Sequence, residues 1–142
     1  MKIEILRHDV INNDIQQQVK DLFNELNSNI KQLSLTETLK NNNNIVLAVC
    51  KEDNTLIAMA AMVTYKVISG HKGMIEDVIV SGNQRGKGLG RKLMEKLLDE
   101  AKNMELNEII LFSGHHRTAA ISLYKSLGFQ LKDSGLYRLI FD

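Results

Sequence analysis

Near the middle of the chain a strand-like run is followed by a glycine-rich turn: Met74-Ile75-Glu76-Asp77-Val78-Ile79-Val80, then Gln84-Arg85-Gly86-Lys87-Gly88-Leu89-Gly90. From Leu89 onward, apolar residues recur at helical spacing, so the turn leads into an amphipathic helix. A helix start presents unpaired backbone N–H groups and the positive end of the helix dipole, and glycines let a ligand approach that backbone. We therefore predict a polyphosphate site at this strand-to-helix junction.

The charges around this helix start also indicate an anion. Helix starts usually favour Asp and Glu, which complement the dipole. Here the first turns carry cations instead, and the first acid is Glu95; the cations are Arg85, Lys87, Arg91 and Lys92. A bound anion would explain why cations gather where the dipole disfavours them.

Two common phosphate-binding patterns do not match the spacing. A Walker A loop has four residues between its first Gly and its Gly-Lys pair. In this chain Gly82 and Gly86 enclose three residues. A Rossmann fingerprint, Gly-x-Gly-x-x-Gly, would need Gly where the chain has Arg91 or Leu93. The site is therefore neither a P-loop nor a dinucleotide fingerprint.

Two ordered motifs match a different pattern. The first, Arg/Gln-x-x-Gly-x-Gly/Ala, is met by Arg85, Gly88 and Gly90. The second, Ala-x-x-x-Tyr-x-x-x-Gly-Phe, spans Ala120–Phe129. With these motifs the chain resembles the GCN5-related N-acetyltransferase (GNAT) superfamily, specifically from about residue 73 to residue 129.

Within that family two branches stay open. The segments Ile75–Val80 and Arg85–Gly90 look most like glucosamine 6-phosphate N-acetyltransferases. The segment His115–Ala120 is instead similar to small bacterial enzymes that acetylate aminoalkyl phosphonates and related amines.

The resemblance implies an α/β fold with an α+β mixed sheet, the GNAT acyl-CoA N-acyltransferase fold. Its central sheet is mostly antiparallel, has one splayed parallel pair and is flanked by helices. With 142 residues, of which 44% are hydrophobic, the chain suits a single domain over residues 1–142. A net charge of +1 gives no reason to expect nucleic-acid binding. No apolar run reaches transmembrane length and no signal peptide is evident, so we expect a cytoplasmic protein without membrane partners.

The spacing of apolar residues and the positions of turn-forming residues predict an order of strands and helices along the chain that agrees with this fold. The expected strands are residues 2–6, 45–51, 55–67, 74–80 and 108–113, with closing strands at 129–132 and 137–141. The expected helices are residues 11–26, 33–40, 89–103 and 118–127, and a turn is expected at 69–73. The strand at 108–113 should lie parallel to that at 74–80, because a helix crossover joins them.

The resemblance implies that acetyl-coenzyme A binds at the glycine-rich junction. Its pyrophosphate would lie on backbone N–H groups, and nearby cations would contact other phosphates. In the family, the splayed strand frees backbone groups to pair with the pantetheine arm and to hold the thioester carbonyl. The cofactor-binding residues are then Val78, Ile79, Val80, Arg85, Gly86, Lys87, Gly88, Leu89, Gly90 and Arg91.

Aminolysis of a thioester also needs a proton donor and a base. Tyr124 matches the family's general acid, and a phenol is neutral at pH 7 and able to donate. Glu76 and Asp77 are the main candidates for the base; Glu76 is the first choice as base or amine contact, and Asp77 is expected to be a substrate-binding residue. Placing a carboxylate in an otherwise apolar strand costs free energy unless a partner group offsets it. The presence of both acids here therefore indicates a catalytic or substrate-binding role for at least one of them. Neighbouring strand residues point to opposite faces, so at most one of the two aims directly at any given pocket.

The residues after the 108–113 strand are candidates for substrate binding. His115 and His116 could relay a proton at the end of the sheet where ligands collect. Arg117 stands where the family often has Asn, and its guanidinium could grip a phosphate or carboxylate of the acceptor. The alternative for Arg117 is a solvated cation at a helix start. No spacing of His and Cys indicates a metal site, and the lone Cys50 is expected in the core.

The leading interpretation is an N-acetyltransferase that transfers acetyl from acetyl-CoA to a small-molecule amine by direct attack in a ternary complex. An amino sugar phosphate or another acidic amine is the favoured acceptor. The alternatives are a peptide or protein N-acetyltransferase and a non-catalytic CoA-binding sensor. Strand edges near the C-terminus would permit a homodimer.

Overall fold

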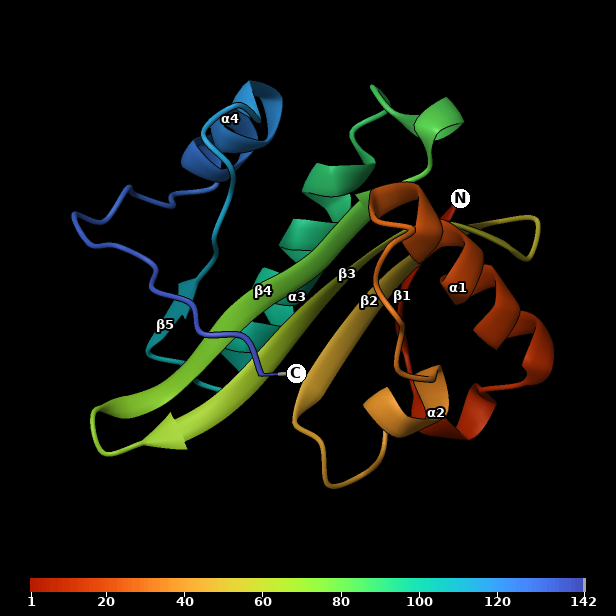
Figure 1. The fold of residues 1–142 in the computed structure, drawn as a ribbon, viewed down its shortest axis with the longest axis horizontal. Helices are drawn as coiled ribbons and strands as arrows, with labels where there is room; N and C mark the ends of the chain where they lie inside the picture. The colour runs from red at the N-terminus through yellow and green to blue at the C-terminus, as the bar shows by residue number, and fades with distance from the viewer. Residues whose placement is uncertain (142) are drawn as a thin grey trace. The chain divides into compact units, whose positions relative to one another are not determined.

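The computed structural model describes residues 1–141, and the chain separates into two compact units, Met1–Phe112 and a second unit that begins at Ser113. Figure 1 traces the chain from red to blue. The strands are β1 (Lys2–Leu6), β2 (Ile45–Glu52), β3 (Thr55–Val67), β4 (Gly70–Val80) and β5 (Glu108–Ile110). The α-helices are α1 (Asn13–Leu26), α2 (Leu35–Thr38), α3 (Leu89–Asn103) and α4 (Thr118–Ser126), and two short 3-10 turns are η1 (His8–Val10) and η2 (Gly82–Gln84).

The five strands form one mixed sheet in the first unit. Their order is β1-β2-β3-β4-β5, with antiparallel pairing from β1 to β4 and a parallel β4–β5 pair (Figure 1). The helix α3 connects the two parallel strands, as a parallel pair requires. This confirms the fold class predicted from the sequence.

The sheet is covered on both faces, which the strand pattern explains. On one face α1 and α2 pack through Leu22 and Leu35 onto alternate strand residues such as Val49 and Met59. The intervening residues, including Cys50, are also fully or nearly fully buried, and α3 packs against the same strands. Cys50 is a free thiol in the core, as expected, and burial raises its pKa. The run from Ala58 to Met62 is core as well.

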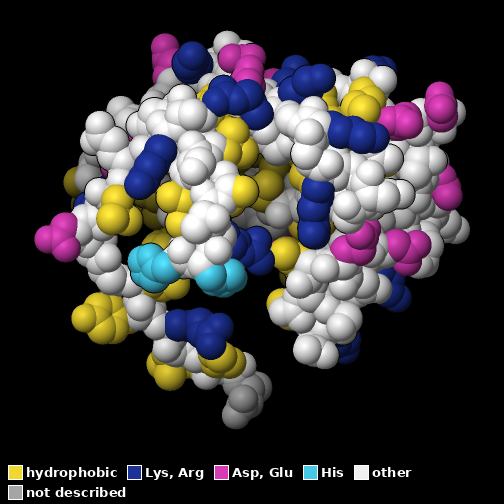
Figure 2. Space-filling view, turned by 90° about the horizontal axis from the view of Figure 1, so that it is seen from above, with side chains coloured by type: hydrophobic (Ala, Val, Ile, Leu, Met, Phe, Trp, Pro, Cys, Tyr) yellow, Lys and Arg dark blue, Asp and Glu magenta, His cyan; other side chains and the backbone are white. Residues whose placement is uncertain are grey.

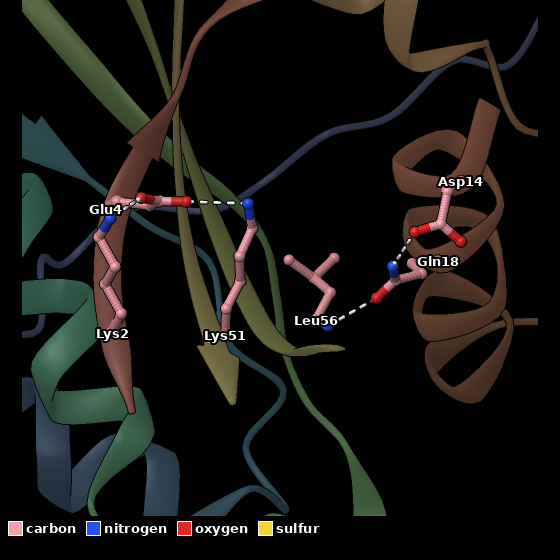
Figure 3. Close-up of polar contacts among 6 residues, drawn as sticks. All are labelled: Lys2, Glu4, Asp14, Gln18, Lys51 and Leu56. Carbon is pink, nitrogen blue, oxygen red and sulfur yellow. Dashed lines mark hydrogen bonds and ion pairs between the residues drawn. The ribbon is translucent and has the colours of Figure 1, made fainter. Parts of the chain in front are cut away.

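Side-chain contacts fix the start of α1, join α1 to β3 and link β1 to β2. The helix α1 begins after Asn12, whose side chain accepts from the Ile15 N–H. Further along α1, Gln18 Nε2 donates to Asp14, while Gln18 Oε1 accepts from the Leu56 N–H at 2.7 Å, which ties the helix to the start of β3 (Figure 3). Near this contact, on the neighbouring strands, Glu4 of β1 pairs with Lys2 and with Lys51, and Lys51 of β2 stands opposite Leu56 (Figure 3).

Two predicted boundaries were wrong in this unit. The predicted helix at 33–40 is only the short α2, because Ser34 caps its start and the chain turns again at Asn43, whose side chain donates to Thr38 O. The predicted turn at 69–73 is a strand from Gly70 onward, and only residues 68 and 69 form the turn. The glycines there signal close packing instead of a loop: Asn107 bonds both the N–H and the C=O of His71.

The predicted closing strands at 129–132 and 137–141 were also wrong. Residues 129–141 contain no strand, and β5 stops at Ile110 instead of residue 113. Apolar alternation can indicate a strand, but a strand forms only where a neighbour accepts and donates its backbone hydrogen bonds. In this segment large apolar side chains remain exposed, among them Leu131, Tyr137 and Phe141. The strand edges that would have permitted a homodimer are therefore missing from the described segment after β5.

No helix in residues 1–141 is both long enough and apolar enough to cross a bilayer.

We predict that Gly70→Ala destabilises the fold by about 1–3 kcal/mol, because φ is +146° and an added Cβ would collide with Asn107 Oδ1. Urea unfolding followed by circular dichroism measures the loss. Gly135→Ala is the matched control, since a Cβ there meets only Tyr137 Cε2 at 3.9 Å. Equal stability of the Gly70 variant and the unaltered protein would contradict the prediction.

Candidate active site

The parallel strands separate partway along β4. Their pairing runs from Lys72↔Glu108 to Met74↔Ile110, whereas β4 continues to Val80. From Ile75 onward β4 is therefore paired with β3 alone among the described residues. The predicted residues Val78, Ile79 and Val80 lie in this separated part, where one edge of the strand offers its backbone groups.

A bulge in β4 falls on the two predicted acids. Ile79 pairs with Met59 and Glu76 pairs with Ala61, so Asp77 and Val78 together stand opposite one β3 residue. Asp77 has φ of +51°, a left-handed conformation that Asp tolerates better than most residues. The bulge interrupts the regular alternation of side chains between the two faces of the strand. Alternation alone therefore does not tell which of Glu76 and Asp77 faces the candidate site.

Both carboxyls have altered proton affinities. Glu76 and Asp77 keep contact with solvent, but the surrounding chain removes part of the water around each carboxyl. This desolvation raises the pKa of Glu76, and the neighbouring Asp77 carboxylate raises it further. Desolvation also raises the pKa of Asp77. Each carboxylate is thus a stronger proton acceptor than an ordinary surface acid.

The glycine-rich loop that follows β4 has room beside its backbone. Gly86 has φ of +81° and Gly88 has φ of +76°, conformations that favour glycine. A Cβ added at either position meets no atom within 4 Å. The loop therefore exposes its backbone to a ligand instead of packing it against the protein.

The start of α3 differs from the starts of α1 and α2. Asn12 caps α1 and Ser34 caps α2, and each helix has an acid in its first turn. The cap position of α3 is Gly88, which has no side chain to accept a hydrogen bond, and the first turn contains no acid. The first N–H groups of α3 thus lack the side-chain acceptor that the other two helices have.

Cations flank this helix start in the sequence, and Figure 2 shows Lys and Arg side chains (dark blue) at several places on the face seen from above. Arg85 Nε lies 3.4 Å from the Val80 carbonyl oxygen, and Lys87 Nζ lies 2.7 Å from Gln84 Oε1. Within residues 1–141 neither Arg85 nor Lys87 has a carboxylate partner, whereas Arg91 pairs with Glu95 on the next turn of α3.

The loop is supported by residues that the sequence analysis missed. The Ser81 N–H donates to Ile57 O at 2.9 Å, and the Gln84 N–H donates to Ser81 O at 2.8 Å. The Gly82 N–H donates to Glu25 Oε1 at 3.0 Å. Glu25 lies 57 positions earlier in the chain, so no local motif could have indicated this contact.

In the second unit, the turn before α4 contains three predicted residues. His115, His116 and Arg117 are exposed, and the His116 ring lies against Gly114. The turn is closed by the Arg117 N–H, which donates to Gly114 O at 3.0 Å. Arg117 occupies the cap position of α4 without a side-chain capping bond.

Tyr124 lies on α4 in the same unit and is held by the residues that end the helix. Its ring contacts that of Phe129 edge to face, with centroids 6.1 Å apart. Gly128 ends the helix with φ of +100°, and the Phe129 N–H donates to Tyr124 O at 3.0 Å. Burial raises the pKa of the Tyr124 phenol, and the positive charge of Arg117 opposes that rise.

The structure thus groups the predicted residues by unit. Glu76, Asp77, the end of β4 and the loop from Arg85 to Arg91 follow one another in the first unit, while His115, His116, Arg117 and Tyr124 belong to the second. The catalytic and binding roles of these residues stay predictions. Among residues 1–141, no three His, Cys, Asp or Glu side chains come together to hold a metal ion.

We predict that Asp77→Asn lowers the pKa of Glu76, because the substitution removes the like charge but retains a side chain that tolerates positive φ. The Glu76 carboxyl should then ionise at lower pH, yet still above an ordinary Glu, since burial is the larger cause. A carbon-13 NMR titration of the Glu side chains measures this. Glu52→Gln, a carboxylate not among the causes of the Glu76 shift, is the control; an unchanged Glu76 titration in Asp77→Asn would refute the coupling.

Comparison with known proteins assigns the chain to a family. The model of the acetyltransferase (GNAT) family matches residues 13–129. The chain is 30% identical over 82 residues to the L-amino acid N-acyltransferase MnaT of Escherichia coli, which covers 57% of this chain and 48% of that protein. It is 48% identical over 42 residues to the glucosamine 6-phosphate N-acetyltransferase of Arabidopsis thaliana, which covers 30% of this chain and 28% of that protein.

The matched part thus spans about half the length of the first of these curated relatives, and less of the second. A crystal structure of a "predicted acetyltransferase with acetyl-CoA" from Clostridium acetobutylicum shares the fold. Its TM-score is 0.71 with 22% identity, over 97% of this chain and 95% of that one. Because the family model covers most of the chain, including β4, the glycine-rich loop and α3, this protein belongs to the GNAT acetyltransferase family.

Proposed function

We propose that this chain is an acetyl-CoA-dependent N-acetyltransferase that acts on a small amine carrying an acidic group. The observation that carries the proposal is the start of α3, which has a glycine at its cap position, no acid in its first turn and cations around it. Coenzyme A contains a pyrophosphate and a third phosphate. These anions would supply the negative charge that the N–H groups and cations of this helix start lack within the protein.

The residues present fit this coenzyme. The N–H groups from Gly86 to Arg91 would hold the pyrophosphate, and the open space beside Gly86 and Gly88 leaves room for it. Arg85 and Lys87, which have no carboxylate partner among the described residues, would contact phosphate oxygens. When bound, acetyl-CoA supplies the acetyl thioester and a thiolate leaving group.

The separated part of β4 would hold the reacting end. Its free edge offers backbone N–H and C=O groups from Ile75 to Val80, and the pantetheine arm contains amides that can pair with them. A backbone N–H of this edge would stabilise the negative charge that develops on the thioester oxygen. Removing one such donor in other enzymes costs about 3 kcal/mol of barrier, so a backbone donor is sufficient.

Glu76 and Tyr124 would move the protons. The amine nitrogen forms a bond to the acetyl carbon while the carbon–sulfur bond breaks. Glu76, whose pKa is raised by desolvation, would accept the amine proton directly or through water. Tyr124, whose pKa is raised by burial, stays protonated through neutral pH and would donate its proton to the thiolate.

The acidic group of the acceptor is inferred from Arg117 and from the named relatives. Arg117 presents an exposed guanidinium beside His115 and His116, and a guanidinium binds carboxylates and phosphates in a bidentate fork. One relative is named for L-amino acids and another for glucosamine 6-phosphate. Both acceptors combine an amine with an anionic group. Asp77 would contact the amine, and we propose a cytoplasmic setting.

Charge at the helix cap provides the first test of this proposal. We predict that Gly88→Asp weakens coenzyme A binding roughly tenfold more than Gly88→Asn, because a carboxylate near a phosphate adds a repulsion of about 1–2 kcal/mol. Asp and Asn tolerate positive φ similarly, so the pair isolates charge from backbone strain. Isothermal titration calorimetry measures both dissociation constants. Equal binding by the two variants would place the phosphates elsewhere.

Turnover tests the reaction and its acceptor class. Thiol release from acetyl-CoA should be faster with glucosamine 6-phosphate than with glucosamine, and faster with an amino acid than with its amide. The preference should shrink in Arg117→Gln, because the amide cannot form the charged fork. A basic peptide that outperforms every small amine would favour a protein acetyltransferase instead.

The same assay separates an enzyme from a coenzyme-binding sensor. Tyr124→Phe should lower kcat by roughly 100-fold or more, the usual contribution of a general acid, and leave coenzyme A affinity unchanged. Tyr137→Phe is the control, since that side chain is 95% exposed in the same unit. An unaltered kcat in Tyr124→Phe would remove Tyr124 from the mechanism.

A further inference from the structure

We propose that Glu25 is a positioning residue that holds the coenzyme loop in its binding conformation from the helix α1. This inference rests on the proposed function, because it assigns the loop between β4 and α3 to coenzyme A. Glu25 Oε1 accepts a hydrogen bond from the Gly82 N–H at 3.0 Å, and Gly82 begins the η2 turn that leads into the loop. In Figure 1 the last turn of α1 and the η2 turn lie beside each other, in agreement with this contact.

The contact belongs to a series along one face of α1. Gln18, Leu22 and Glu25 are spaced by four and three residues, so they share a face of the helix. Gln18 bonds the Leu56 N–H at the start of β3, Leu22 is buried in the core, and Glu25 bonds Gly82 just beyond the end of β4. Two side chains of α1, one on each side of the buried Leu22, thus accept hydrogen bonds from backbone N–H groups of β3 and of the turn after β4.

The two contacted segments are themselves joined. The Ser81 N–H donates to Ile57 O at 2.9 Å, which links the residue after Leu56 to the residue before Gly82. Within the loop, the Gln84 N–H donates to Ser81 O at 2.8 Å, and Ser81 Oγ bonds Asn83 Oδ1 at 3.1 Å. Glu25 thus joins this turn to a packed helix and restrains the backbone that leads into the loop.

A carboxylate beside a phosphate-binding loop has two opposing effects. Its negative charge repels an anion and would weaken coenzyme binding. Its hydrogen bond orients the loop and would strengthen binding by reducing the ordering needed on association. The second effect accounts for an acid at this position, and the two effects predict opposite signs for the change in coenzyme affinity on the same substitution.

The same helix also carries the segment between α1 and α2. Gln32 Nε2 donates to Lys20 O at 3.0 Å and to Asn24 Oδ1 at 3.1 Å, so residues 27–34 fold back onto α1. Asn24 and Glu25 are adjacent, so one turn of α1 contacts both this segment and the coenzyme loop.

The test measures coenzyme A affinity in Glu25→Ala, Glu25→Gln and Asp21→Ala by calorimetry, with steady-state kinetics for acetyl-CoA and the amine. Glu25→Ala should raise the coenzyme Kd about fivefold, the loss expected for one hydrogen bond of ordinary net strength. Its KM for acetyl-CoA should rise equally with kcat unchanged. Glu25→Gln keeps a side-chain oxygen that can accept from Gly82, so it should restore affinity to that of the unaltered protein or better.

Asp21→Ala is the matched control, because it removes a carboxylate from the same helix whose partner is Gln17 within α1. It should leave the coenzyme Kd unchanged. Equal affinity in all three variants would overturn the role of Glu25, and so would tighter binding by both Glu25 variants, which would mean that only charge matters. Failure of the unaltered protein to bind coenzyme A would instead overturn the proposed function, and the coenzyme role of Glu25 with it.

Discussion

The first N–H groups of α3 have no side-chain cap, and the candidate site is built around this helix start. Its cap residue, Gly88, supplies no acceptor for the first N–H groups, and the surrounding side chains are cations instead of acids. By its own preferences this would be a poor helix start. The helix forms because its inner face, including Leu93 and Leu97, is completely buried against the sheet. Core packing thus holds the helix and leaves its positive end available for an anionic ligand.

The sheet places that helix start next to a strand edge that is also available. The β4–β5 pairing ends at Met74, and the bulge at Asp77 bends the remaining part of β4 just before the loop begins. Backbone groups on the strand and backbone groups on the helix are therefore separated only by the loop from Ser81 to Gly88. A ligand that contains both amides and phosphates can use both sets, which is why a coenzyme of this composition suits the site.

Sequence patterns predicted the elements well where packing and local preference agree. The helix α3 and the strand β3 have the predicted bounds, because the apolar period of α3 and the buried run of β3 both reflect the core. Predictions failed where a pattern needed a partner elsewhere in the chain. Residues 137–141 alternate like a strand but have no strand neighbour, and Gly70 looked like a turn although it makes room for Asn107. For the site, the motif residues were found, whereas Glu25 was not, because its contact joins positions 57 residues apart.

Residue type and short spacing were enough to identify the family, the glycine-rich loop and the candidate residues Glu76 and Tyr124. Only the folded chain shows where β4 leaves its neighbour, that a bulge lies between Glu76 and Ile79, and that α1 contacts the turn before the loop. The two groups of properties differ in how far apart along the chain the interacting residues lie. Turn conformation and charge at a helix start are local properties, but strand pairing, desolvation of a carboxyl and a hydrogen bond from α1 arise only when distant segments pack together.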